Sequence, residues 1–192
     1  MSTLALIADL KEWAEEKLCD IKFKQQAEIN TDSTYSYNLV KPAVFLQFLP
    51  DTDRLPDGVN DIFPCMLLQW DNDEKKPMEN KATCTIRLDL AIWNPGTHAP
   101  DIIGGDPSNV EAFKRNGEGW QDIVNWIDRI TRELCNNDII KGKYRIRHED
   151  GLRSGRMDEQ GTIYDYYPFY LGFVEFSIEY TTPKIKPYND LL

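Results

Sequence analysis

A short pattern of residues is of the type that could hold a metal ion and cut nucleic acid. It begins with Pro56 and Asp57. It continues with Glu74, Lys75 and Lys76 or, alternatively, with Glu79, Asn80 and Lys81. Metal-dependent nucleases gather carboxylates and a lysine around magnesium ions. Here the first lysines follow a predicted strand instead of lying within it, and so short a pattern often arises by chance. A nuclease is therefore an alternative, which DNA cleavage abolished by Asp57→Ala would support.

Other patterns that carry catalysis or metal binding are missing or incomplete. The stretch DTDRLPDGVNDI starts like a calcium loop, but Leu55 and Pro56 replace a ligand and the required glycine, and Ile62 replaces the bidentate glutamate. The two histidines, His98 and His148, have no metal-ligand spacing. The sequence also has no G-x-S-x-G, Walker or G-x-G-x-x-G motif. We therefore expect no catalytic residue, no cofactor and no metal.

The cysteines indicate the compartment. Cys19, Cys65, Cys84 and Cys135 are widely spaced and form no C-x-x-C pair. The N-terminus has no signal-like segment, and no apolar run approaches the length of a membrane span. We expect an intracellular protein with reduced thiols and no membrane partner, with three of the cysteines on apolar faces.

Length and charge limit the fold and the partners. The 192 residues suit one domain, predicted over 1–182, followed by an exposed tail over 183–192. Apolar residues make up 41% and charged residues 28% of the chain, as in an ordinary globular protein. The net charge of −10 disfavours nonspecific attraction to nucleic acid phosphates.

One segment has the opposite sign. Its basic residues are Lys141, Lys143, Arg145, Arg147, Arg153 and Arg156. Glu149, Asp150, Asp158 and Glu159 are the acidic residues in and just beyond it. The segment is either a docking patch or a strand edge that its charges keep soluble.

Helical spacing identifies two elements that must carry the core. Ser2 or Thr3 can cap a helix over 4–18 whose apolar positions include Leu6, Leu10 and Trp13. A second helix over 119–135 has an apolar stripe. The residues of this stripe are Trp120, Ile123, Val124, Ile127, Ile130 and Leu134.

Period-two alternation and apolar runs predict the strands. Residues 82–93 and 169–180 alternate between apolar and more polar side chains, 62–70 is apolar on both parities, and 142–148 is a basic strand. A short strand at 42–50 lies between prolines. We predict an α+β fold with a single mixed β-sheet of four to five strands and both helices packed on one face. The long 94–117 segment reads as a functional loop.

The aromatic residues divide into two groups. Trp13 and Trp120 fall on helix stripes and Trp70 closes a buried strand, so core packing explains them. Trp93, Tyr166 and Tyr167 have no such explanation and are candidate interface anchors.

The order of these elements resembles that of phage tail terminator (tail completion) proteins. A capped N-terminal helix precedes a strand ending FPCMLLQW and a long strand TCTIRLDLAIW. A Gly/Pro loop, the helix WQDIVNWIDRITRELC, a basic strand and the final strand YYPFYLGFVEFSIEY follow. The resemblance covers residues 1 to 182.

This resemblance implies a structural protein and not an enzyme. It implies a hexameric ring that caps the head-proximal end of a tail tube, stops tube growth and offers a surface for head–tail joining. Its partners would be five further copies, the tail tube protein, a head–tail connector or neck protein and, in contractile tails, the sheath; DNA would only pass through the channel. The expected location is the virion tail or neck after assembly in the host bacterial cytoplasm. A different neck or connector protein is the alternative within the virion.

Interface candidates come from the second face of the sheet and from the basic segment. In this hypothesis the even positions of 170–180 pack under the helices, while the odd positions face a neighbour or the channel. The candidates are Arg87, Asp89, Trp93, Arg145, Arg147, Arg153, Arg156, Phe173, Glu175 and Glu179.

Overall fold

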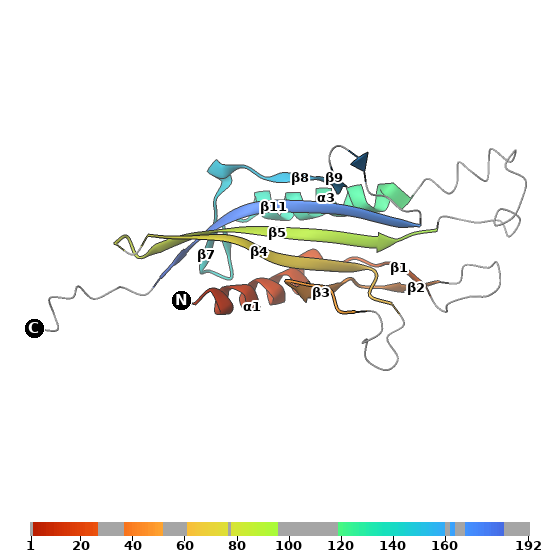
Figure 1. Cartoon of the computed structure of the whole chain (residues 1–192), viewed down its shortest axis with the longest axis horizontal. Coiled ribbons are helices and arrows are strands. Elements are labelled where there is room, and N and C mark those ends of the chain that lie inside the picture. Colours follow the sequence, from red (N-terminus) through yellow and green to blue (C-terminus); the bar gives the residue numbers. More distant parts are fainter. Residues whose placement is uncertain are drawn as a thin grey trace, which may run out of the picture.

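Two helices and a curled mixed sheet form the body of the protein, which confirms the predicted α+β class (Figure 1). The computed structural model describes residues 2–26, 37–51, 61–76, 78–95, 119–159, 162–163 and 168–182. The predicted tail over 183–192 and nearly all of the predicted 94–117 loop lie outside these residues.

Three long antiparallel strands make the centre of the sheet. They are β4 (Cys65–Lys76), β5 (Lys81–Trp93) and β11 (Phe169–Thr181). β5 and β11 stay in register along their whole length, from Trp93 opposite Phe169 to Lys81 opposite Thr181. Because side chains alternate along a strand, the even-numbered residues of β5 and β11 share one face and the odd-numbered residues share the other.

Short strands extend the sheet on both sides. β3 (Ala43–Leu46) runs parallel to β4, and β8 (Arg153–Arg156) runs antiparallel to β11. β7 (Tyr144–Ile146) pairs with another part of β11, and β6 (Ile139–Ile140) pairs with β7. Among the described residues the sheet therefore has seven strands and not the predicted four to five. Strands of two to four residues are too short to show an alternating pattern.

In the described ranges, two small hairpins and a short helical turn lie outside the main sheet. The hairpins are β1 (Phe23–Gln26) with β2 (Tyr37–Val40), and β9 (Asp158–Glu159) with β10 (Thr162–Ile163). The turn is η4 (His148–Asp150). Both strands of the first hairpin thus lie in the mostly polar stretch 21–41.

β4 is longer than predicted, because it continues through the polar stretch DNDEKK to Lys76. A β-bulge between Trp70 and Asn72 separates its apolar half from its polar half. Most polar-half side chains are exposed, so this arm of the hairpin needs no apolar alternation.

The helices begin and end close to the predicted residues. α1 (Thr3–Trp13) is capped by Ser2, whose Oγ accepts a hydrogen bond from the Ala5 N–H, and it continues as the π-helical turn η1 (Ala14–Leu18). α3 (Gly119–Asn136) buries a stripe that includes Ile123, Trp126 and Ile130. Trp126 belongs to this stripe and Trp120, contrary to the prediction, does not, since Trp120 is 45% exposed.

Both helices pack on the same face of the sheet, the face of the even-numbered residues. Their buried side chains join those of β4, β5 and β11 in one cluster, which includes Leu10, Leu88, Ile127 and Val174. Three of the four cysteines are buried, as expected, and only Cys135 is exposed. Trp70, predicted to close a buried strand, is 39% exposed at the bulge.

Hydrogen bonds fix α1 to the sheet at two places. The Tyr144 hydroxyl donates to Asp9 Oδ2 at 2.6 Å, and Lys143 Nζ lies 3.0 Å from the same oxygen. At the N-terminal end of α1, Asp73 accepts hydrogen bonds from Thr3 at 3.1 Å and from Tyr180 at 3.0 Å. These contacts tie the first residues of the chain to its last strands.

Candidate functional site

The face of the sheet opposite the helices is polar and half-buried. We call it the polar face; it carries the odd-numbered side chains of β5 and β11, including Arg87, Asp89, Phe173, Glu175 and Glu179. The same alternation that buries the even positions places charges here, as the sequence predicted. Its chemistry is therefore that of a surface and not of a core.

Ion pairs cover this face, one within β5 and two between neighbouring strands. Arg87 Nε donates to Asp89 Oδ1 at 2.8 Å, and the Arg87 guanidinium lies 4.7 Å from the centre of the Phe173 ring. Arg153 Nη1 lies 3.0 Å from Glu175 Oε1, and Lys81 Nζ lies 3.1 Å from Glu179 Oε1. Each predicted carboxylate on the polar face thus has a basic partner within the same chain.

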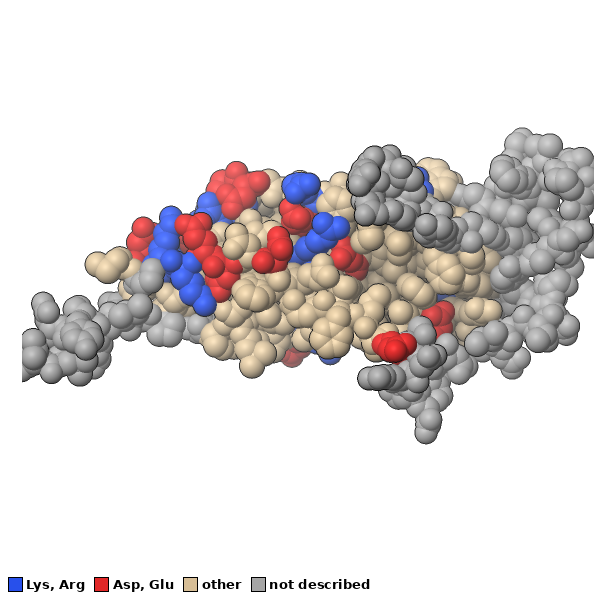
Figure 2. Space-filling model, in the orientation of Figure 1, with Lys and Arg blue, Asp and Glu red and all other residues tan. Residues whose placement is uncertain are grey.

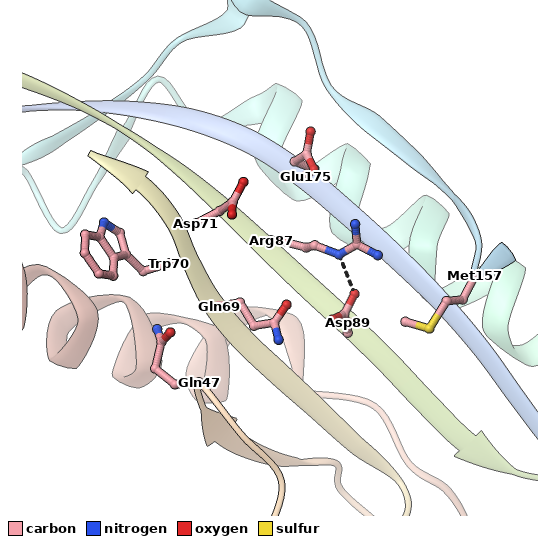
Figure 3. Close-up of a pocket in the computed structure, with 8 residues that line it drawn as sticks. All are labelled: Gln47, Gln69, Trp70, Asp71, Arg87, Asp89, Met157 and Glu175. Carbon is pink, nitrogen blue, oxygen red and sulfur yellow. Dashed lines mark hydrogen bonds and ion pairs between the residues drawn. The ribbon is translucent and has the colours of Figure 1, made fainter. Parts of the chain in front are cut away.

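A hollow of about 470 Å³ opens on the polar face (Figure 3). Its lining comes from β4, β5, β11, the residue after β3 and the residue after β8. The lining residues are Gln47, Gln69, Trp70, Asp71, Arg87, Asp89, Met157 and Glu175. The polar groups of the lining are three carboxylates, two amides and one guanidinium. Carboxylates therefore outnumber cationic groups in the hollow.

The bulge in β4 supplies the exposed carboxylate of this hollow. Asp71 is the extra residue, because Trp70 lies opposite Ile86 and Asn72 lies opposite Thr85. Bulges often redirect a side chain in this way. Asp71 forms no ion pair with any described residue, whereas Asp89 and Glu175 are paired with arginines. Asp71 can therefore accept a cationic group from outside the chain.

The hollow offers charge and hydrogen bonds, and the described residues that line it include no histidine, cysteine or serine. Within the described ranges, no three His, Cys, Asp or Glu side chains come together in a way that could hold a metal ion. Of the nuclease pattern, Pro56 and Asp57 lie outside the described residues, while Glu74 and Lys75 are exposed on the hairpin arm. The described residues thus offer a binding surface.

The basic segment is neutralised from within the chain. Arg145 pairs with Glu149 at 3.3 Å and Arg147 with Asp150 at 2.9 Å. Lys141 pairs with Glu12 on α1. On the face shown in Figure 2, blue and red atoms lie side by side at the end of the molecule where the β4–β5 hairpin and β7 overlap in the view. The expected excess of positive charge is therefore cancelled locally by acidic partners, some of them distant in sequence.

The other predicted interface residues differ in exposure. Trp93, the last residue of β5, is 2% exposed and is therefore buried within the monomer. Arg156 and Phe173 are half-buried, and the Arg153 side chain is 75% exposed. Tyr166 and Tyr167 lie outside the described residues.

Four residues that line the hollow could not be recognised as site residues from the sequence. Gln47, Gln69, Asp71 and Met157 have no pattern that distinguishes them in the sequence. Asp71 reaches the hollow only through the bulge, and Met157 only because β8 pairs with β11. Both depend on contacts between distant segments.

The sequence has no match among models of protein families and none among curated proteins. No helix in the described ranges is long and apolar enough to cross a membrane. The polar face and the order of the elements are therefore the features that bear on function.

Proposed function

We propose that this chain is a structural subunit of a phage or phage-like tail, where six copies form a ring. The ring caps the head-proximal end of the tail tube, ends its polymerisation and offers the surface for joining to the head. This proposal extends the resemblance to tail terminator proteins noted from the element order.

The observation that carries the proposal is the two-faced central sheet. One face is wholly used for packing against α1 and α3, and the other keeps charged side chains half-exposed along strands of 12 and 13 residues. An extended, paired and polar surface of this kind suits contact with neighbours or with a water-filled channel. It supplies binding area and no reacting group.

The charge supports the same proposal. A net charge of −10 repels the phosphates of DNA, so a ring built from this chain would let DNA pass without holding it. The ion pairs of the polar face leave it without a strong positive patch. Passing DNA is therefore cargo and not a ligand.

Electron microscopy of assembled tails tests the proposal. We expect six copies at the head-proximal end of the tube, and we expect that particles lacking this chain carry tubes of irregular length without heads. Six copies in the neck but away from the tube end would favour the alternative of a connector protein. A different location or copy number would reject the terminator assignment.

A further inference from the structure

A single row of side chains crosses the polar face from one border of the sheet to the other. Arg153 lies opposite Glu175, Glu175 opposite Arg87, and Arg87 opposite Gln69. Gln47 continues the row, because Leu46 is level with Leu68 and the Gln47 N–H donates to the Leu68 carbonyl. The row thus begins with Arg153 on β8 and ends with the amides of Gln69 and Gln47 beside β3. Figure 3 shows the part of the row from Glu175 to Gln47.

The two ends of this row differ in charge. At the β3 end, Gln47 and Gln69 line the hollow, which extends across β4 and β5 to Glu175 on β11 and also contains the unpaired carboxylate of Asp71. At the β8 end, the Arg153 side chain is 75% exposed and makes one hydrogen bond, to Glu175. A guanidinium has five N–H donors, so most of its capacity is still available. The ends are therefore complementary.

Both borders of the sheet at this level are strand edges. β3 pairs only with β4, and β8 pairs only with β11, among the described strands. Figure 1 shows them on opposite sides of the sheet. β3 has none of the charges, bulges or internal prolines that protect exposed edges, and Phe48 just beyond it is 75% exposed. An edge of this type favours pairing with another strand.

Strand direction also fits. β8 is antiparallel to β11, and β11 is antiparallel to β5, which is antiparallel to β4. Since β3 is parallel to β4, β8 runs opposite to β3. Suppose that a second copy is related to the first by rotation about an axis parallel to the strands. Its strands then run in the same directions, and its polar face lies on the same side of the joined sheet. Its β8 would therefore meet β3 as an antiparallel neighbour.

We propose that copies of this chain join head to tail through these edges, with β8 of one copy paired to β3 of the next. Arg153 of the first copy then lies level with Gln47 of the second and enters its hollow, where Asp71 accepts the guanidinium. The choice of a second copy as occupant rests on the proposed ring as well as on the charges. A head-to-tail contact of this kind closes into a ring when its rotation allows.

Thiol cross-linking tests the predicted register. Level alignment places Ser154 of one copy opposite Leu46 of the next, at a distance that suits a disulfide after small adjustment. Leu46→Cys and Ser154→Cys are made as separate proteins in a Cys135→Ser background, since Cys135 is the exposed native cysteine among the described residues. We expect a disulfide-linked dimer when the two proteins are mixed under a mild oxidant, and none from either alone. The double variant should give a ladder of higher oligomers.

Matched variants test whether Arg153 of one copy binds in the hollow of the next. Adding Arg153→Glu to the Ser154→Cys protein should lower dimer yield roughly three- to tenfold and remove its salt dependence, as for loss and reversal of one exposed ion pair. Arg145→Glu serves as the control, because Arg145 lies on β7 outside the row and pairs with Glu149. Equal loss in both variants would reject the assignment of the hollow.

Other outcomes reject the edge pairing itself. Asn125→Cys, on the exposed side of α3, serves as a control partner for Leu46→Cys. The edge pairing is rejected if Ser154→Cys gives no more mixed dimer than this control does, or if one variant alone gives a dimer. Failure of the ring contact and failure of the tail assignment remain separable. Six copies at the tube end without this cross-link would reject only the edge pairing, and the cross-link in a protein found elsewhere would reject only the terminator function.

Discussion

Gly172 lies near the start of β11, where side chains of α3 pack directly against the strand. A Cβ added there would lie 2.8 Å from Ile127 Cδ1 and 3.1 Å from both Ile123 Cγ1 and the Gly155 carbonyl oxygen. Favourable carbon contacts begin at about 3.5 Å. Gly172→Ala therefore forces a movement of α3 side chains, of β8, or of both.

The expected cost follows from two opposing effects. Overpacking of a core by a methyl group costs about 1–3 kcal/mol. Replacing glycine by alanine in a strand raises the free energy of unfolding by about 0.5–1 kcal/mol, because alanine has less conformational freedom to lose on folding. The net loss should be about 1 kcal/mol, because Ile127 Cδ1 is the movable end of a side chain while the Gly155 carbonyl belongs to the backbone.

A double-mutant cycle isolates the contact. Ile127→Val removes Cδ1 and alone should cost about 0.5–1.5 kcal/mol. In the double variant the added methyl occupies the vacated space, so the combined loss should be smaller than the sum by about 1 kcal/mol. Urea unfolding followed by circular dichroism measures each free energy, and the melting temperature should change by about 2–4 °C for each kcal/mol.

Gly155→Ala is the matched control. It lies in the neighbouring strand β8, where an added Cβ would be 3.7 Å from Phe173 Cε1, an ordinary contact. This variant should be neutral or slightly stabilising. Strict additivity of Gly172→Ala with Ile127→Val, or a Gly172→Ala protein more stable than the wild type, would refute the reasoning about close approach.

Three further predictions concern the core, pH and the thiols. Ile127→Asp should abolish folding measured by circular dichroism, since a buried unpaired charge costs several kcal/mol, whereas Val124→Asp, only half-buried, should leave a folded but less stable protein. The hydrogen bond from Tyr144 and the contact with Lys143 lower the pKa of Asp9 in the folded state. Its stabilisation is therefore complete above the unfolded pKa of about 3.9 and is lost as pH falls through the lower folded pKa, so acid should destabilise the wild type more than Asp9→Asn in unfolding titrations. Burial raises the pKa of Cys19, Cys65 and Cys84 to about 12, so a thiol reagent should label Cys135 in the native protein and all four cysteines only after unfolding.

The centre of the fold could be predicted from local patterns. Alternation in 82–93 and 169–180 identified β5 and β11 to within a residue or two, and the facing of their side chains was correct. The helix over 119–135 matched α3 equally well. Each of these elements has one face in the core, so burial imposes a period that the sequence displays directly.

Pairing between distant segments decided the rest. The bulge that exposes Asp71, the short strand β8, and the carboxylates that neutralise Lys141 and Lys143 follow from which strands and helices become neighbours. The exposure of Trp120 likewise depends on how α3 is rotated about its axis against the sheet. This rotation buries Trp126 and leaves Trp120 exposed. Sequence periodicity gives the side of an element that is buried; only the tertiary structure fixes its partner, because contact energies depend on side chains that meet across long sequence separations.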